Sequence, residues 1–315
     1  MMYFPFMRGK QFELAALKEV APRLDASKVS PIIEPVNDNI DRLCLAVEAL
    51  NKHSVVPHVI VNPQVGDLAS DTPDYLNLEL SSRPANFIPC VRLHNQNIIH
   101  AQTLLDQLIE DGVPYSLYLE EDIQTSISNY TSSAVVNILQ NMNRYSHAFR
   151  NSLPRSVLVD SSFPAKQRNA DYSRNPQFFS DAHVAYKTPL MQGQIGFGDF
   201  LTIDDVWSTS GGPAFVIALH ITFIDNSNQN MYVKHSLSTK NPNDQSDPAG
   251  KFKEALKEMI DFANLTPSLD QSTLGFQEYI QIYKNGTYHG LGVPKKLSMM
   301  HHIETLNNFF KSSFT

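Results

Sequence analysis

Four acidic residues stand at the ends of short apolar runs: Glu34, Glu120, Asp160 and Asp199. If these runs are strands of a parallel barrel, the four side chains meet at one mouth, where barrel enzymes place their chemistry. Converging carboxylates can hold Mg²⁺ or Mn²⁺ through hard oxygen ligands, or divide acid and base roles between them. We therefore expect a catalytic cluster suited to hydrolysis, with Glu34, Glu120 and Asp160 as metal ligands. The competing interpretation is that each acid caps the next helix or lies in solvent.

Asn62, Arg92 and His220 occupy comparable places at the ends of other apolar runs. An arginine among carboxylates indicates either an anionic ligand or a fixed ion pair. We expect Arg92 and His220 to join the catalytic set and Asn62 to contact the ligand.

Two further features suit an anion. Gly196 and Gly198 lie in the run Gly193-Gln194-Ile195-Gly196-Phe197-Gly198-Asp199, whose backbone N–H groups could bind a phosphate, as late loops of barrels often do. Glycines inside a strand also mark a bulge or a close backbone approach. Arg8 and Lys10 follow an aromatic N-terminal segment and could hold an anion over a barrel mouth, or be solvated charges at a helix start.

Other residues give weaker signals. Lys187 could form a Schiff base if it pointed into the barrel and were desolvated. His301 and Glu304 share one helix face but lack the spacing of a zinc-binding His-Glu-x-x-His helix. The chain has no Gly-x-Ser-x-Gly elbow, Walker loop or paired-cysteine motif, so serine hydrolase, NTPase and zinc-ribbon functions have no support.

The apolar runs predict buried strands separated by stretches of helical periodicity. The strands are expected at 31–34, 56–62, 87–93, 115–120 and 156–160. Helical stripes are carried by Leu43 to Leu50, by Ala101 to Leu108 and by Val135 to Met142. Strand followed by helix, repeated, is typical of a parallel sheet. Because Ile33-Glu34-Pro35-Val36-Asn37 is not a glycine-rich phosphate loop, we expect an irregular (β/α)8 TIM-type barrel rather than an open doubly wound sheet.

After Asp160 the pattern loosens, with strands expected at 183–187, 195–200, 215–223 and 232–237. The turn formers at 225–230 join the last two into a β-hairpin, which we interpret as an insertion at about 215–237. A helical part, 250–315, begins with an apolar face formed by Phe252, Ala255, Leu256, Met259 and Ala263. Apart from the polar loop 240–250, no linker rich in Gly, Ser or Pro stands out, so a single domain over 1–315 is the simpler expectation.

Composition limits the partners. The 315 residues are 42% apolar and carry a net charge of -7, the wrong sign for a protein that coats duplex DNA, although a local basic channel stays open. No run of eighteen apolar residues occurs and the start does not resemble a signal peptide, so we expect a cytoplasmic protein without a membrane partner. Cys44 and Cys90 have no metal-type spacing and are expected to be buried thiols.

Four segments resemble the Beta protein family: Met2 to Glu13, Pro31 to Val36, Gly196 to Phe200 and Ser298 to Glu304. The resemblance spans the whole chain. It implies a context of satellite coliphages, phage-derived islands or phage defence, often beside a small nuclease-like gene. It implies no reaction and no catalytic residue.

The leading hypothesis is a metal-assisted hydrolase that acts on a phosphoester or other small anionic substrate. The alternative is a non-catalytic scaffold that binds a nuclease, a nucleic acid or a phage component through the edge of the hairpin. A sugar-processing barrel ranks lower, because Trp207 is the only tryptophan available to stack on a pyranose ring.

Overall fold

The structure, a computed structural model, describes residues 2–69, 80, 82–186, 188, 191–208 and 214–312. The chain divides into two compact units. The first comprises Met1–Ser161 and Ala185–Phe200, and the second comprises Ser162–Val184 and Leu201–Thr315. The single-domain organisation expected from the sequence stays a prediction.

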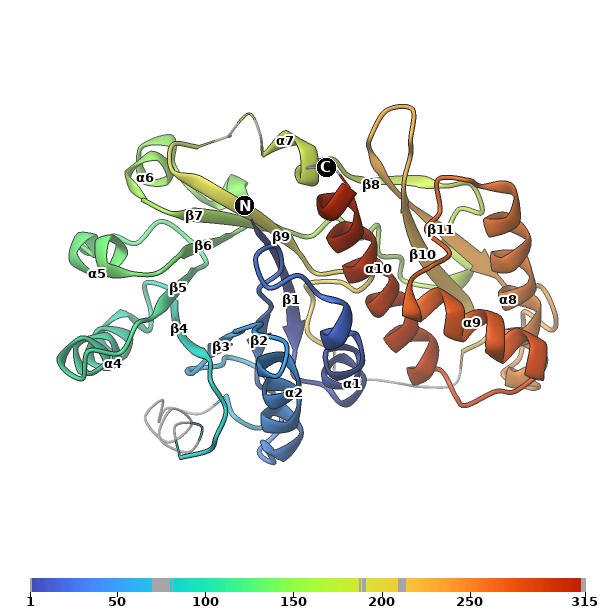
Figure 1. The fold of residues 1–315 in the computed structure, drawn as a ribbon, viewed down its shortest axis with the longest axis horizontal. Helices are drawn as coiled ribbons and strands as arrows, with labels where there is room; N and C mark the ends of the chain where they lie inside the picture. Colours follow the sequence, from blue (N-terminus) through green and yellow to red (C-terminus); the bar gives the residue numbers. More distant parts are fainter. Residues whose placement is uncertain are drawn as a thin grey trace. The chain divides into compact units, whose positions relative to one another are not determined.

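The first unit is a closed barrel of parallel strands in the order β1-β2-β3-β4-β5-β6-β7-β9 (Figure 1). The strands are β1 (Met2–Arg8), β2 (Ile32–Glu34), β3 (His58–Ile60), β4 (Ile88–Leu93), β5 (Ser116–Leu119), β6 (Asn137–Gln140), β7 (Ser156–Asp160) and β9 (Gln194–Asp199). The barrel closes where β9 pairs in parallel with β1. The predicted TIM-type α/β barrel is therefore confirmed.

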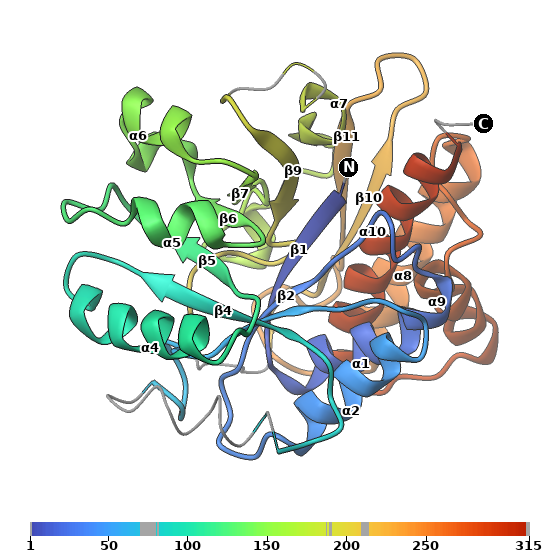
Figure 2. The same ribbon diagram turned by 60° about the vertical axis from the view of Figure 1, so that its left-hand side comes forward.

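Helices follow the strands on the outside of this barrel, as Figure 2 shows. They are α1 (Gln11–Val20), α2 (Asp41–Asn51), α4 (Ile98–Glu110), α5 (Ser128–Ser133) and α6 (His147–Ser152), with short 3-10 turns at Ala21–Arg23 and Met142–Arg144. The predicted stripe of α4 is buried through Ala101, Leu105 and Leu108, which pack in one cluster with outward-facing strand residues such as Leu117. Amphipathic spacing therefore determines which face of the helix covers the sheet.

The barrel interior is filled by alternate residues of the strands. Phe4 and Phe6 of β1 lie in one cluster with Ile32, Ile60 and Tyr118 of neighbouring strands. Burying each of these side chains stabilises the fold by roughly 1.5–3 kcal/mol. Cys90 belongs to the same cluster, and Cys44 is buried in α2, so both cysteines are the buried free thiols that the sequence predicted.

Several elements differ from the sequence-based assignment, among them β8 (Gln177–Ser180), where no strand was predicted. The aromatic segment 2–8 is the first barrel strand, although no strand was predicted there. Residues 137–140 form strand β6, whereas Val135 to Met142 had been assigned to a helix. A short apolar run fits the periodicity of a helix as well as that of a strand. Here the run pairs with β5 and β7 and is therefore a strand. The segment expected as a strand at 183–187 contains helix α7 (Ala182–Ala185).

The second unit contains an antiparallel sheet of order β10-β11-β8, made of β8 (Gln177–Ser180), β10 (Ala218–Ile224) and β11 (Met231–Leu237). Strands β10 and β11 form the predicted hairpin. The remaining elements are the 3-10 turn Asn169–Asp171 and helices α8 (Pro248–Leu265), α9 (Leu274–Asn285) and α10 (Gly292–Ser312). The predicted apolar face of α8 is buried, Phe252 and Met259 included.

Helix α10 covers the free edge of β10. The Ser298 hydroxyl and the His301 ring donate to the backbone oxygens of His220 and Thr222, the latter over 2.6 Å. Glu304, one turn further, accepts a hydrogen bond of 2.6 Å from the backbone N–H of Leu274 at the start of α9. The segment 298–304, singled out in the sequence, therefore binds backbone groups and joins three elements of this unit. Among the described residues, no helix is long and apolar enough to cross a membrane.

Candidate functional site

Four predicted site residues share the inner face at the carboxyl ends of neighbouring strands: Arg8, Glu34, Asn62 and Arg92. Side chains alternate across a strand, so each follows an interior residue two positions earlier, as Glu34 follows Ile32 and Arg92 follows Cys90. The register places Arg8 beside Glu34. Glu120 comes two residues after the interior Tyr118 and completes the group.

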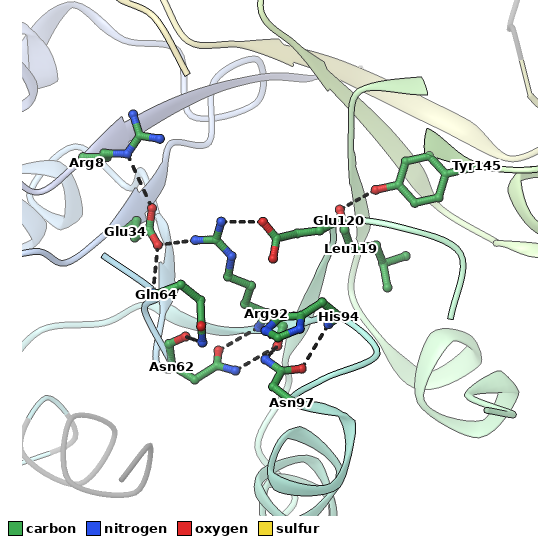
Figure 3. A network of polar contacts seen from close by, with 10 residues as sticks. All are labelled: Arg8, Glu34, Asn62, Gln64, Arg92, His94, Asn97, Leu119, Glu120 and Tyr145. Atoms are coloured by element: carbon green, nitrogen blue, oxygen red, sulfur yellow. Dashed lines mark hydrogen bonds and ion pairs between the residues drawn. The ribbon is translucent and has the colours of Figure 1, made fainter. Parts of the chain in front are cut away.

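Arg92 links the two carboxylates of this group, as Figure 3 shows. Its Nη1 donates to Oε1 of Glu34, and its Nη2 lies 2.5 Å from Oε1 of Glu120. On the other side of Glu34, Nε of Arg8 lies 3.7 Å from Oε2. Two arginines and two glutamates therefore balance in charge at the carboxyl end of the barrel.

The main chain of Arg92 is held by two amide side chains. Asn62 accepts from the Arg92 N–H over 2.7 Å and donates to the Arg92 carbonyl over 2.8 Å. Asn97 donates to the same carbonyl over 3.0 Å. Below the guanidinium lies the ring of Tyr118, whose centroid is 5.4 Å from Arg92 Cζ. Contacts therefore hold Arg92 along its whole length, from its backbone to its guanidinium group.

The two carboxylates of the cluster differ in their exposure to solvent. The Glu34 side chain is fully buried, whereas the Glu120 side chain is 18% exposed. Glu34 also accepts a 3.2 Å hydrogen bond from the backbone N–H of Gln64. Within the described part of the chain, the side chain of Glu120 hydrogen-bonds only through Oε1, to Arg92. Glu120 is consequently the more accessible carboxylate, whereas the buried Glu34 pairs with both arginines.

Electrostatics keep Arg92 charged. Burial would lower its pKa, but the hydrogen bond to Glu120 and the charges of Glu34 and Glu120 outweigh burial and raise it. Losing one member of such a buried pair typically costs 3–5 kcal/mol, because the partner is left charged and uncompensated. Replacing one member of the cluster alone should therefore destabilise the protein more than replacing both members of a pair.

Asp160 and Asp199 lie on the other face of the barrel wall. Val157 and Val159 fill the interior, so Asp160 points outward with Leu158, where it accepts from the backbone N–H of Met142 over 3.4 Å. Burial raises the pKa of the Asp160 carboxyl. Asp199 accepts a 2.7 Å hydrogen bond from the outward Tyr3 hydroxyl. Of the four acids expected to converge, Glu34 and Glu120 share the inner face, and Asp160 and Asp199 do not.

Other predicted residues have different surroundings. His220 belongs to the second unit, on β10, and does not end a barrel strand. Lys10 is the N-cap residue of α1. At Gly196 and Gly198 a Cβ would lie 2.5 Å from the Met2 oxygen and 2.2 Å from the Phe4 oxygen, which explains both glycines by close approach of β1. Lys187 lies outside the described residues.

The sequence did not point to Gln64, Asn97 or Tyr118. The first two lie in loops after strands, and only the register places them beside Arg92 and Glu34. Tyr118 was visible as an apolar strand residue two positions before Glu120. That spacing would have placed it beneath the strand-end charges.

Within the described ranges, no group of three or more His, Cys, Asp or Glu side chains is arranged to hold a metal ion. Glu34 and Glu120 are the predicted ligands on a common face, and both are paired with Arg92. The fold and the site define an eight-stranded parallel α/β barrel with a paired arginine–glutamate cluster at its carboxyl end. Comparisons with family models, curated proteins and solved structures give no match for this chain.

Proposed function

We propose that the barrel is a hydrolase acting on a phosphoester or another small anionic substrate at the carboxyl end of its strands. The observation that carries this proposal is the convergence of Arg8, Arg92 and Glu120 on the inner face, at the end where barrel enzymes hold their substrates. The setting implied by the family resemblance, a phage-derived island or phage defence, is part of the same proposal.

In this proposal the arginines bind the anionic group. A guanidinium has five N–H donors, so Arg92 keeps donors beyond its two carboxylate bonds, and its Nε–H donates to no acceptor in the described chain. Substrate oxygens that gain charge in the transition state would be stabilised by these donors. Glu34 would act as a positioning residue, because it is fully buried and holds both arginines.

Glu120 would transfer the proton. Its partial exposure and its second oxygen suit a group that takes a proton from water and returns it to the leaving oxygen. Hydrolysis then balances without another reagent: water adds to phosphorus, the ester P–O bond breaks, and the leaving alcohol receives the proton.

Metal assistance by Mg²⁺ or Mn²⁺ is a variant of this proposal. A cation shared by Glu34 and Glu120 would compete with Arg92 for the same oxygens. Asp160 would not contribute from its outward position. Hydrolysis that requires Mg²⁺ or Mn²⁺ would favour the variant, and hydrolysis that persists in a chelator would favour the arginine-based site.

The test is hydrolysis of bis(p-nitrophenyl) phosphate by the full-length protein, with and without chelator, in wild type and Glu120→Gln. The amide keeps an oxygen for Arg92 but cannot take up a proton, so activity should fall at least a hundredfold while the protein stays folded. Asp160→Asn is the matched control, because it removes a strand-end carboxylate on the outer face and should retain activity. Equal losses in both variants, or none in Glu120→Gln, would contradict the assignment.

A scaffold that binds a nuclease-like partner or a phage component stays the alternative. It was expected to use the hairpin edge, but the described β10 edge is covered by α10. The turn at 225–230 is the more exposed part of the hairpin. Shortening this turn should abolish co-elution with a partner if the scaffold role is right, and should leave hydrolysis unchanged if the barrel is the functional part.

A further inference from the structure

Two histidines of the second unit face each other across the hairpin. His220 and His235 are directly opposite in the β10–β11 register, and their Nδ1 atoms lie 2.7 Å apart. The backbone oxygens of His220 and Thr222 accept from α10, so they point away from β11. The histidines therefore form a non-hydrogen-bonded cross-strand pair, the arrangement in which opposite side chains approach most closely.

Aromatic rings fix both imidazoles. Tyr172 stacks on His235 with centroids 4.4 Å apart, and Phe163 meets the edge of His220 at 4.9 Å. His235 is fully buried, and its Nε2 has no hydrogen-bond partner in the described chain. His220 is partly exposed, which leaves a route from solvent to the pair. The pair therefore packs against aromatic rings and is exposed to solvent only in part, at His220.

Burial favours the neutral form of both rings. Burial lowers the pKa of His235 to about 4, with Lys234 and Lys166 adding to the effect. Burial, the neighbouring His235 and Lys295 lower the pKa of His220 in the same direction. Neutral imidazoles have the lone pairs that a metal ion requires, so no proton has to be removed from the pair first.

We infer that His220 and His235 form a binding site for one divalent transition-metal ion of the imidazole-preferring class, such as Ni²⁺ or Zn²⁺. Metal–nitrogen bonds of about 2.0–2.1 Å at a right angle place two nitrogens about 2.9 Å apart. The observed 2.7 Å is close to that separation. The rings need to open only slightly, which favours the right-angled geometry of Ni²⁺ over the wider angle of tetrahedral Zn²⁺.

Binding replaces the hydrogen bond between the rings. The imidazole that donates from Nδ1 shifts that proton to its own Nε2, so both Nδ1 atoms face the ion and no net proton is released. Water completes the coordination from the exposed side of His220. The charges of Lys166 and Lys295 oppose a dication, so we expect micromolar rather than nanomolar affinity.

The experiment is calorimetric titration of the chelator-stripped, full-length protein with Ni²⁺ and with Zn²⁺ at neutral pH. We expect one ion per chain, bound more tightly for Ni²⁺. His220→Gln and His235→Gln should each weaken binding at least tenfold. His289→Gln is the control, because His289 is an exposed histidine of the same unit and should leave binding unchanged.

A second measurement guards against a variant that merely misfolds. In wild type, Zn²⁺ should shift the imidazole ¹⁵N resonances of His220 and His235 and leave those of His289 in place. Glu120→Gln should retain Ni²⁺ binding, since the barrel cluster is a separate proposal. Absent binding in wild type, binding retained in both histidine variants, or binding lost in Glu120→Gln alone would overturn the inference.

Discussion

Arg92 hydrogen-bonds with both Glu34 and Glu120, which stand 86 residues apart in sequence numbering. The Arg92 guanidinium on β4 therefore links the end of β2 to the end of β5. The two carboxylates differ in exposure: the Glu34 side chain is fully buried, and the Glu120 side chain is 18% exposed.

Replacing this arginine should destabilise the barrel strongly. Arg92→Met keeps the stem but leaves Glu34 charged and buried, so the free energy of unfolding should fall by about 3–5 kcal/mol. Urea unfolding followed by circular dichroism measures the loss. The double variant Arg92→Met with Glu34→Gln should recover part of it, and a double variant no better than the single one would refute the ion-pair explanation.

A methyl group at Gly198 should be poorly tolerated. Its Cβ would lie 2.2 Å from the Phe4 backbone oxygen and 2.9 Å from a Val159 methyl, so β1 and β9 would have to separate. Gly198→Ala should lower the free energy of unfolding by at least about 1–3 kcal/mol, as overpacking does. Gly112→Asn serves as the control in the same thermal unfolding assay, since nothing lies within 4 Å of a Cβ at Gly112 and asparagine tolerates its positive φ.

Stability should fall as the pH drops below neutrality. Burial lowers the pKa of His58 and of His301 to about 4 from 6.5. Between these values the unfolded chain binds more protons than the folded chain, so the free energy of unfolding rises with pH through this window. Each histidine contributes up to about 3 kcal/mol at pH 7, and the contribution is lost as the pH falls toward 4.

Urea midpoints measured at pH 7.5, 6 and 5 test this dependence. His58→Gln should flatten the slope of the wild-type curve, because an amide does not titrate. Identical slopes for wild type and variant would show that His58 is not held neutral by burial.

Removing the cover of the β10 edge should expose backbone acceptors. His301→Phe leaves the Thr222 carbonyl without its ring donor, which should cost about 1–3 kcal/mol. An uncovered edge also pairs more readily with other strands. Sedimentation velocity should therefore show more self-association in the variant than in Phe309→Leu, a change on α10 that leaves the two edge hydrogen bonds in place. Equal association in both variants would argue against the covering role.

The sequence predicted most strand ends but not which face each residue takes. Barrel strands are buried on both faces, so Val157-Leu158-Val159 is a continuous apolar run without alternation. Glu34 and Asp160 therefore looked equivalent. Only the register with neighbouring strands, which depends on contacts distant in sequence, distinguishes the interior Val159 from the outward Asp160.

The same limit explains β1 and β6. A proline such as Pro5 is uncommon inside a strand, yet its neighbours Phe4 and Phe6 fill the barrel. Without β1, the sequence left Arg8 between an anion-binding residue over a barrel mouth and a solvated charge at a helix start, and did not identify it as the end of a strand. The histidine pair was invisible for a related reason, since the hairpin was predicted but the pairing of His220 with His235 follows from its register.

The division of the chain into two interleaved units also determines the order in which their strands are synthesised. The polypeptide passes from the first unit to the second after Ser161, returns at Ala185 to supply β9, and leaves again after Phe200. Strand β8 is thus made before the last barrel strand and must wait for β11 before it can pair. A truncation after Phe200 would contain every barrel strand yet carry β8 without its partners, so neither unit can be isolated by a single cut.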